Sequence, residues 1–415
     1  MPKTLFHIIT VSFISAHLQI YAQTEEKGSD KKSLLERTEL EIYGTLLYNN
    51  FNWDTDSAKR DQVDLNRVIF EPSFQINEKL KLEMEIEFEH GGTGSSMEFD
   101  RFEEFGEFEQ EIEHGGEIIM EELAIEWEMK PRFVLIAGKI KVPVGLTNFY
   151  DKPTDYFTTT YNNMEATILP VGWYEIGVGA EGSFDKKEKF KYYLVFVNAL
   201  DNSAFSSANW IQRGNQQRFE YVNAESFAIA GRLDFAFSDR SVIGLSGYAC
   251  NSTPNRPKPD LDAAGWVSVF DAHTHVELKD LTFRVMVLYG RLQNADLISD
   301  ANKNLSNNLN VKRTPVGSGT FGYFAEAGYD ILSFFPQQDK SSLQIFAGYY
   351  YYDTMYETTG EIFNNPRWQR NEIRFGANYQ WDETIGLKAD FTNREINIPS
   401  ANIENTTTIA LTFNL

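Results

Sequence analysis

The sequence KLKLEMEIEFEH at residues 79–90 alternates apolar and charged side chains. Leucine, methionine, isoleucine and phenylalanine occupy the even positions, and lysine or glutamate occupies the odd positions up to Glu89. A period of two over this length predicts a strand with one apolar face and one charged face. A helix would distribute both kinds of side chain around its circumference, so the stretch favours a sheet whose two faces meet different surroundings.

Segments with a comparable pattern recur along the chain, and we expect sixteen strands. Each has roughly the ~10 residues that a tilted strand needs to cross a bilayer. The expected strands lie at about 39–52, 63–76, 79–90, 118–129, 132–140, 173–184, 189–198, 225–237, 241–250, 264–278, 281–292, 320–334, 342–353, 367–380, 384–394 and 405–415.

The connections between these strands alternate between short and long. Asn77-Glu78 and Lys279-Asp280 are short, whereas 91–117, 141–172 and 199–224 are long. A barrel with both termini in the periplasm has tight periplasmic turns and long outer loops, whereas a soluble sandwich has no reason to sort its loops in this way. The predicted fold class is therefore all-β: a transmembrane antiparallel β-barrel of about 16 strands, with short periplasmic turns and long extracellular loops.

The composition agrees with this fold and excludes others. No stretch after the N-terminal region supplies the ~20 apolar residues of a membrane-spanning helix, and the mean hydropathy is −0.39. The formal net charge of −22 makes nucleic acid an unsuitable partner. The single cysteine, Cys250, excludes an intrachain disulfide and a thiolate metal site.

The N-terminus has the order of regions of a secretory signal. Lys3 precedes an apolar stretch from Leu5 to Ile14, and Ala22 precedes Gln23. We expect residues 1–22 to be a signal peptide rather than a buried helix. Residues 23–38 are expected to be a polar periplasmic lead-in, and residues 39–415 the barrel. The expected location is the outer membrane of a Gram-negative cell, after cleavage of the signal peptide, in contact with lipid and lipopolysaccharide.

If the apolar faces point at lipid, the opposite faces line the lumen. The third strand and the eleventh lie opposite each other in a sixteen-stranded ring, so an acidic wall would face a wall that carries arginines. Such opposed charges would create a transverse field that sorts solutes; alternatively, they pair within each wall and stabilise it. The predicted pore-lining residues are Glu83, Glu85, Glu87, Glu126, Arg232, Arg284, Glu326, Arg374, Lys388 and Arg394.

Two other groups of side chains contain potential metal ligands. The acidic run from Glu98 to Glu117 would hold divalent cations or be a solvated outer loop. His273 and His275 share the inward face of one strand, where they either bind a metal or line the lumen. Neither group has a complete set of ligands, so we expect no metal and no cofactor. No catalytic constellation is recognisable, and enzymatic activity is not expected.

The segment Gly138-Lys139-Ile140-Lys141-Val142-Pro143-Val144-Gly145-Leu146 resembles a motif of the phosphate-selective porin O and P family. The likeness implies a homotrimer of sixteen-stranded barrels whose third outer loop folds inward and narrows the pore. Here that loop is 141–172. The constriction residues that the resemblance implies are Lys141, Asp151, Lys152, Asp155 and Glu165. The family's ladder of arginines and lysines has no residue-by-residue counterpart in this acidic chain, so phosphate specificity is not expected.

The sequence therefore favours a porin that lets small hydrophilic solutes or ions diffuse through a water-filled channel, with weak selectivity or a mild preference for cations. The alternatives are a barrel that acts as a surface binding or adhesion protein and a lipid-acting enzyme of the outer membrane.

Overall fold

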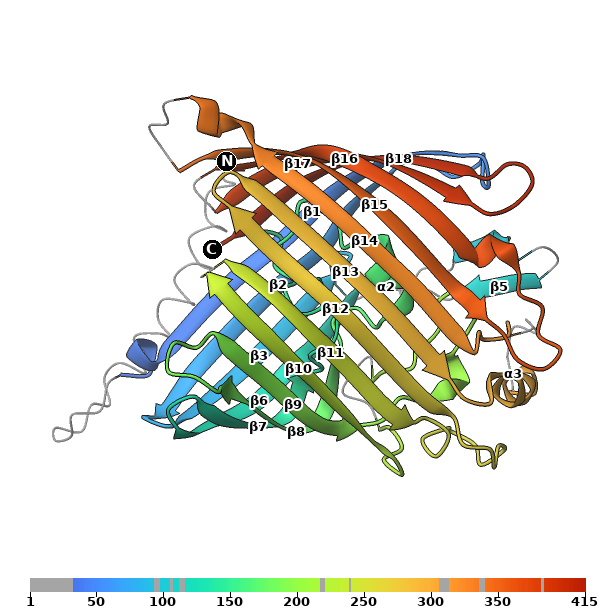
Figure 1. The fold of residues 1–415 in the computed structure, drawn as a ribbon, viewed down its shortest axis with the longest axis horizontal. Helices are drawn as coiled ribbons and strands as arrows, with labels where there is room; N and C mark the ends of the chain where they lie inside the picture. The colour runs from blue at the N-terminus through green and yellow to red at the C-terminus, as the bar shows by residue number, and fades with distance from the viewer. Residues whose placement is uncertain are drawn as a thin grey trace, which may run out of the picture. The chain divides into compact units, whose positions relative to one another are not determined.

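The computed structural model describes residues 33–92, 98–104, 107–111, 116–216, 221–238, 240–305, 313–335, 340–381 and 384–415, and side chains outside 93–115. Sixteen strands form one closed antiparallel barrel (Figure 1). They are β1 (Thr38–Trp53), β2 (Gln62–Asn77), β3 (Leu80–Glu89), β6 (Glu117–Lys130), β7 (Phe133–Lys141), β8 (Tyr174–Ser183), β9 (Phe190–Asn198), β10 (Phe227–Ser238), β11 (Ser241–Asn251), β12 (Trp266–Leu278), β13 (Leu281–Leu292), β14 (Gly319–Asp330), β15 (Ser342–Glu357), β16 (Gln369–Trp381), β17 (Ile385–Ile396) and β18 (Ile403–Asn414).

The last strand closes the ring by pairing with the first. Leu46 of β1 lies opposite Leu411 of β18, in a register that runs from Tyr43 with Asn414 to Trp53 with Glu404. Closure removes the free edges that would otherwise leave backbone donors and acceptors unsatisfied in an apolar medium.

Apolar side chains form the outer face of this barrel. They remain exposed in the isolated chain although they are large, as at Leu233, Leu245 and Phe270, which are 56–62% exposed. Their neighbours along each strand are buried, and the burial patterns of β10 and β11 alternate residue by residue. Such an outer face fits hydrocarbon rather than water.

The predicted fold class is confirmed, and the observed strands coincide with the predicted ones to within a few residues. The predicted strand 320–334 is too long. β14 ends at Asp330, whose side chain accepts a hydrogen bond from the backbone N–H of Leu332 at 3.0 Å and begins the 3-10 turn Ile331–Phe334. The predicted outer loop 91–117 contains a two-stranded hairpin, β4 (Glu98–Glu104) and β5 (Glu107–Glu111), outside the barrel sheet.

The helices are short. They are the 3-10 turn Leu35–Arg37, α2 (Asn163–Ile168), the turn Asn202–Ala204, α3 (Ala295–Lys303), the turn Ile331–Phe334 and the turn Pro366–Trp368. Within the described residues, none is long and apolar enough to span a membrane. The predicted signal peptide, and the lead-in as far as residue 32, lie outside the described residues. So do the side chains of nearly all of the acidic run Glu98–Glu117.

Candidate functional site

The segment 141–172, which we call the inward loop, leaves the wall at the end of β7 and returns to it at β8. Between these points it contacts strands that lie on different sides of the ring, from β2 to β17. Its helix α2 packs against β14 and β15 and is seen behind the front strands in Figure 1. The loop therefore crosses the interior of the barrel.

The base of the loop, residues 142–148 and 162–169, is held by apolar packing and one carboxylate. Glu165 accepts hydrogen bonds from the backbone N–H groups of Thr147 at 3.0 Å and Asn148 at 2.7 Å. Asn162 caps α2 by accepting from the N–H of Glu165 at 2.8 Å. The buried side chains Val142, Val144, Leu146, Met164, Ile168 and Leu169 belong to the main hydrophobic core. Glu165, predicted as a constriction residue, is buried and binds the loop's own backbone.

Gly145 is the point at which the base is fixed to the wall. Its carbonyl oxygen accepts from Arg232 Nη1 at 2.6 Å, and its N–H donates to Asp271 Oδ2 at 3.1 Å. Its φ is +94°, and an added Cβ would lie 2.3 Å from Glu165 Oε1. Glycine is required because both the left-handed backbone and the close carboxylate exclude a side chain.

His273 lies between two carboxylates beside this point. Its Nδ1 is 2.6 Å from Asp271 Oδ1, and its Nε2 is 3.0 Å from Asp234 Oδ1. Arg232 Nε donates to Asp234 Oδ2 at 2.8 Å. His275 contacts Glu277 instead, at 3.3 Å. In the part of the chain that the structure describes, no group of three or more such side chains is arranged to hold a metal ion. The two histidines belong to the inner wall's hydrogen-bond network.

The tip of the loop, residues 149–161, reaches β17 on the other side of the ring. Lys388 Nζ donates to the carbonyl oxygens of Pro153 at 2.5 Å, Tyr156 at 2.7 Å and Thr158 at 3.0 Å. The side chain of Lys388 is fully buried. An ammonium group has three donors, and here all three are directed at the backbone of the tip.

Asp390, the next inward residue of β17 after Lys388, makes a second contact with the tip. Asp390 Oδ2 accepts from the N–H of Thr159 at 2.8 Å and from Arg374 Nη2 at 2.7 Å. Arg374 also donates to the hydroxyl of Thr159 at 2.8 Å. The side chain of Glu372 accepts from Asn163 Nδ2 at 2.7 Å. The predicted lumen residues on β16 and β17 thus bind the loop directly.

The tip also makes ion pairs with side chains of β1 and β2 and with Lys141 at the end of β7. Asp151 lies 3.7 Å from Arg67 Nη2 and 3.2 Å from Lys141 Nζ. Lys152 lies 3.2 Å from Glu71 and also pairs with Glu41.

Arg67 is central to the predicted acidic wall. Its Nε lies 2.7 Å from Glu87, and its Nη2 lies 3.9 Å from Glu85. Tyr174 donates its hydroxyl to Glu85 at 2.7 Å. The carboxylates of β3 therefore do not face the lumen as a uniform acidic surface, because a buried arginine lies among them.

The remaining predicted pore-lining residues except Glu126 also have ion-pair partners close by. Arg284 Nη1 donates to Glu326 at 2.9 Å, and Arg394 Nε donates to Glu404 at 2.6 Å. Glu83 pairs with Lys81. Glu126 lies opposite Lys81 in the β3–β6 register. The structure places all ten predicted residues on the inner face, but the arginines pair with carboxylates on their own or neighbouring strands. The field predicted between opposite walls is reduced accordingly.

Several important residues were not predicted. In β2, Arg67, Ile69 and Glu71 lie two residues apart and share one face, so the period of two was sufficient to place Arg67 inward. Glu121 gave no such signal, because the register between β3 and β6 shifts between Glu85 and Ile86. This bulge brings Glu121 to the interior next to Glu122, where it lies 3.9 Å from Lys139.

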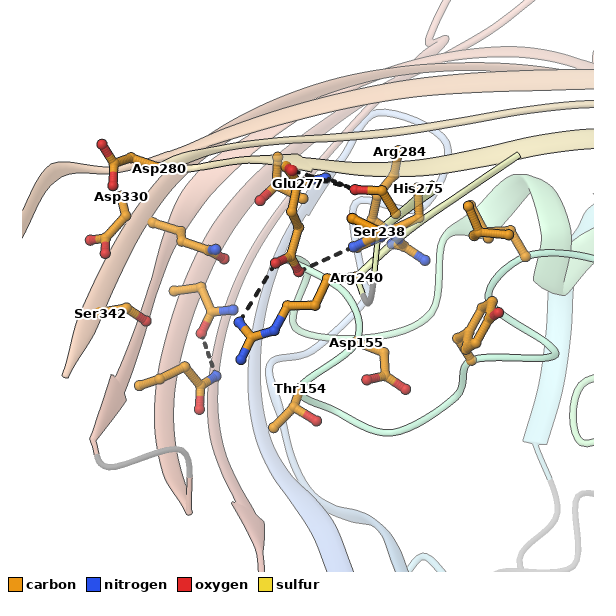
Figure 2. A pocket seen from close by; sticks show the side chains of 18 of the residues that line it. Thr154, Asp155, Ser238, Arg240, His275, Glu277, Asp280, Arg284, Asp330 and Ser342 are labelled. Atoms are coloured by element: carbon orange, nitrogen blue, oxygen red, sulfur yellow. Dashed lines mark hydrogen bonds and ion pairs between the residues drawn. The ribbon is translucent and has the colours of Figure 1, made fainter. Parts of the chain in front are cut away.

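A polar cavity of about 610 Å³ lies on the side of the short turns. Thr154 and Asp155 of the tip line it, with Arg240, His275 and Glu277 of the wall (Figure 2). Arg240 and Glu277 form an exposed ion pair with 3.6 Å between Nη1 and Oε2. Burial raises the pKa of Asp155. Of the predicted constriction residues, Asp155 is the one that lines this cavity.

The outer loops pack together on the opposite side. Arg256 Nη1 donates to the side-chain oxygens of Asn202 and Asn302, each at 2.7 Å, which joins three of these loops. Trp210 is fully buried, and its Nε1 donates to the carbonyl of Gly317 at 3.1 Å. The loop 199–224 thus contributes to the same hydrophobic core as the base of the inward loop.

As a result, the lumen is packed rather than open where the inward loop crosses it. Every barrel strand has an inward side chain that is at most 6% exposed. In chain order, with one residue for each strand, these buried side chains are Tyr43, Ile69, Glu85, Ala124, Ile140, Glu175, Val195, Ala230, Tyr248, Val269, Met286, Phe324, Tyr350, Glu372, Lys388 and Ala410.

Comparisons with known proteins agree with this fold. OmpF of Salmonella typhi has a similar structure, with a TM-score of 0.55 and 10% sequence identity over 91% of this chain and 97% of OmpF. An anion-selective porin from Comamonas acidovorans gives a TM-score of 0.51 and 9% identity over 91% of this chain and 99% of that porin. A protein of Aquifex aeolicus (strain VF5) described as uncharacterized is 26% identical over 359 residues, which cover 85% of this chain and 74% of that protein. No family model matches the chain. The chain therefore has the fold of a porin-like outer-membrane barrel.

Proposed function

We propose that this protein is an outer-membrane channel for small hydrophilic solutes or ions. One observation carries the proposal: a loop anchored to several walls crosses a closed sixteen-stranded barrel above a polar cavity of about 610 Å³. A barrel interior lined with polar side chains is suited to hydrated solutes. The loop defines the narrowest level, where the field acting on a solute is strongest.

The distribution of charge supports a mild preference for cations. Glu122, Glu126 and Glu181 lie on the inner face of β6 and β8 and take part in none of the ion pairs found among the described residues. The arginines at 67, 232, 284, 374 and 394 each pair with a carboxylate. The resemblance to phosphate-selective porins rests on the sequence of the segment 138–146, and we do not propose phosphate specificity.

Planar-bilayer recording of the purified, refolded protein tests this function. We expect stepwise conductance. In a KCl gradient we expect a reversal potential that is displaced slightly from zero towards the equilibrium potential of K⁺. A strong anion preference with current blocked by low phosphate would refute the charge assignment and favour the specificity of the phosphate-selective family. Absence of conductance at any salt concentration or voltage would refute the channel.

The packed interior favours one alternative, a surface-binding protein with a closed barrel. Its large outer loops would then carry the activity, and the barrel would serve as an anchor. Saturable binding of a surface ligand, without conductance, supports this alternative. Detergent-dependent hydrolysis of lipid without conductance would instead support a lipid-acting enzyme.

We further propose an outer-membrane location, with lipopolysaccharide and lipid around the apolar face, and a homotrimer like that implied by the family resemblance. Heat-modifiable migration on a semi-native gel tests the barrel in its membrane form, because an unfolded barrel migrates differently from a folded one. Cross-linking in intact outer membranes tests the trimer. Fractionation with the soluble periplasmic proteins would contradict the location.

A further inference from the structure

We infer that the tip of the inward loop is a gate held shut by ionic contacts, and that it opens while the base of the loop stays in place. The inference rests on the proposed channel function, whose regulation it describes. The passage that would open runs along the inner face of β16, β17 and β18.

The first reason is that the two parts of the loop are held by different forces. The base contributes Val142, Leu146 and Ile168 to the hydrophobic core. Among the described residues, the tip contributes no buried side chain to that core, although Phe157 stacks on Phe346 of β15. Its polar contacts with the wall come from charged side chains, of which Lys388 and Asp390 make the closest. The hydrogen bonds of the tip can be exchanged for hydrogen bonds to water that enters from the cavity, whereas withdrawing the apolar base would expose hydrophobic surface with no compensating contact. The tip can therefore detach under conditions that leave the base packed.

The second reason is that the tip separates two accessible spaces along the same strands. On the side of the short turns, Asn378 of β16 and Asn414 of β18 line the polar cavity. On the side of the long loops, the inward Arg394 is 22% exposed, and Thr406 is partly exposed. Between these levels the inward side chains are buried: Lys388 is fully buried and Thr408 is 5% exposed.

The third reason is the local geometry of the closing contact. The three N–H groups of Lys388 are all bound to carbonyl oxygens of the tip. If the tip withdraws, water entering from the cavity hydrates both the ammonium group of Lys388 and the freed carbonyls. Detachment thus leaves no buried charge without a partner, which would otherwise make it prohibitively unfavourable.

Single-channel recording of the Lys388→Met variant tests the gate. We expect open probability to rise about tenfold or more, because a charge-assisted hydrogen bond is removed at each of three carbonyls. Lys186→Met, in an exposed periplasmic turn, changes the net charge equally and serves as the control.

A disulfide that can be formed and reduced between the tip and the wall provides a second test of the gate. The double variant Thr159→Cys with Asp390→Cys should conduct when reduced and close when oxidised; the native Cys250 is buried and does not interfere. Heat-modifiable migration verifies folding of each variant. If the wild type conducts and neither Lys388→Met nor oxidation of the cysteine pair changes its open probability, the gate is refuted and the channel stands. If no folded variant conducts under any condition, the channel function itself fails.

Discussion

Arg232 Nη1 donates a hydrogen bond to the carbonyl oxygen of Gly145 at 2.6 Å, although 87 positions separate the two residues. This contact joins the wall at β10 to the root of the inward loop. Asp271 binds the N–H of the same glycine at 3.1 Å. A buried arginine and a buried aspartate therefore hold the two peptide units that flank the Cα of Gly145, and the loop's position depends on both of them.

Replacing Arg232 with Met should destabilise the barrel by about 3–5 kcal/mol, because Asp234 loses its buried cationic partner. Unfolding by guanidinium in detergent or liposomes, followed by tryptophan fluorescence, measures the change. The control is Arg240→Met: its side chain is 73% exposed and 3.6 Å from Glu277, so the loss should stay below about 1 kcal/mol. Equal losses in the two variants would contradict the assigned role of Arg232.

The Gly145→Ala variant should lose about 1–3 kcal/mol of stability, because its positive φ and the adjacent Glu165 carboxylate both oppose a Cβ. Gly231→Ala is the matched control. Its backbone is not in the left-handed region, and the nearest atoms to an added Cβ lie 3.5 and 3.6 Å away. The same unfolding measurement should show little change there. A stable Gly145→Ala protein would mean that the loop root is not rigid.

Introducing lysine on the outer face should reveal contact with lipid. Leu245→Lys places a charge at a position 61% exposed on the outside of β11, and we expect a cost of about 2–4 kcal/mol if the position is near the bilayer midplane. Leu34→Lys, ahead of the first strand and 62% exposed, should be nearly neutral. Comparable behaviour of the two variants in liposomes would argue against a lipid-facing wall.

Neutralising the unpaired carboxylates should move ion selectivity towards anions. In the Glu126→Gln, Glu181→Gln double variant, fewer negative charges concentrate cations within a Debye length of about 8 Å of the wall. The reversal potential in a KCl gradient should shift accordingly. Glu188→Gln, in an exposed turn, should leave it unchanged. No difference between these variants would mean that the two carboxylates do not face the conducting path.

The outer loops should loosen in acid. The hydrogen bond from Arg256 holds the pKa of Asp260 below its ordinary value. A lowered pKa in the folded state means that this contact stabilises the loops above about pH 4, the ordinary aspartate range, and is lost as pH falls through the lowered value. Hydrogen exchange in residues 251–265 should accelerate below that range. The Asp260→Asn variant should exchange rapidly at neutral pH and show less dependence on pH; unchanged exchange would exclude this pair as the contact that orders the loops.

The period-two pattern was sufficient to find the strands and to assign their faces. In residues 79–90 the apolar and charged positions separate completely, and the structure has Leu82 and Ile86 on one face and Glu85 and Glu87 on the other. The alternation of short and long connections fixed the order of neighbours, because a short turn forces adjacent antiparallel pairing.

The bulge in β6 could not be predicted in this way. One extra residue brings both Glu121 and Glu122 inside, and the sequence EEL at 121–123 carries no mark of it. The end of β14 was predicted wrongly for a related reason. The residues Ile331–Phe334 have a strand-like sequence, but the side chain of Asp330 caps a 3-10 turn that directs them away from the sheet. Both errors arise from local backbone geometry that hydrophobic periodicity does not encode.

The sequence by itself determined the closed antiparallel barrel, the number of its strands and, outside the β6 bulge, the face on which each strand residue lies, because these follow from side-chain alternation and loop length. Only the tertiary structure decided what the inward residues do. Lys388 binds carbonyl oxygens more than 200 positions away, and Arg67 neutralises carboxylates that the alternation had suggested were open to the lumen. Periodicity specifies the face on which a charge lies, but the distance to its partner depends on how the ring closes and on where the inward loop comes to rest.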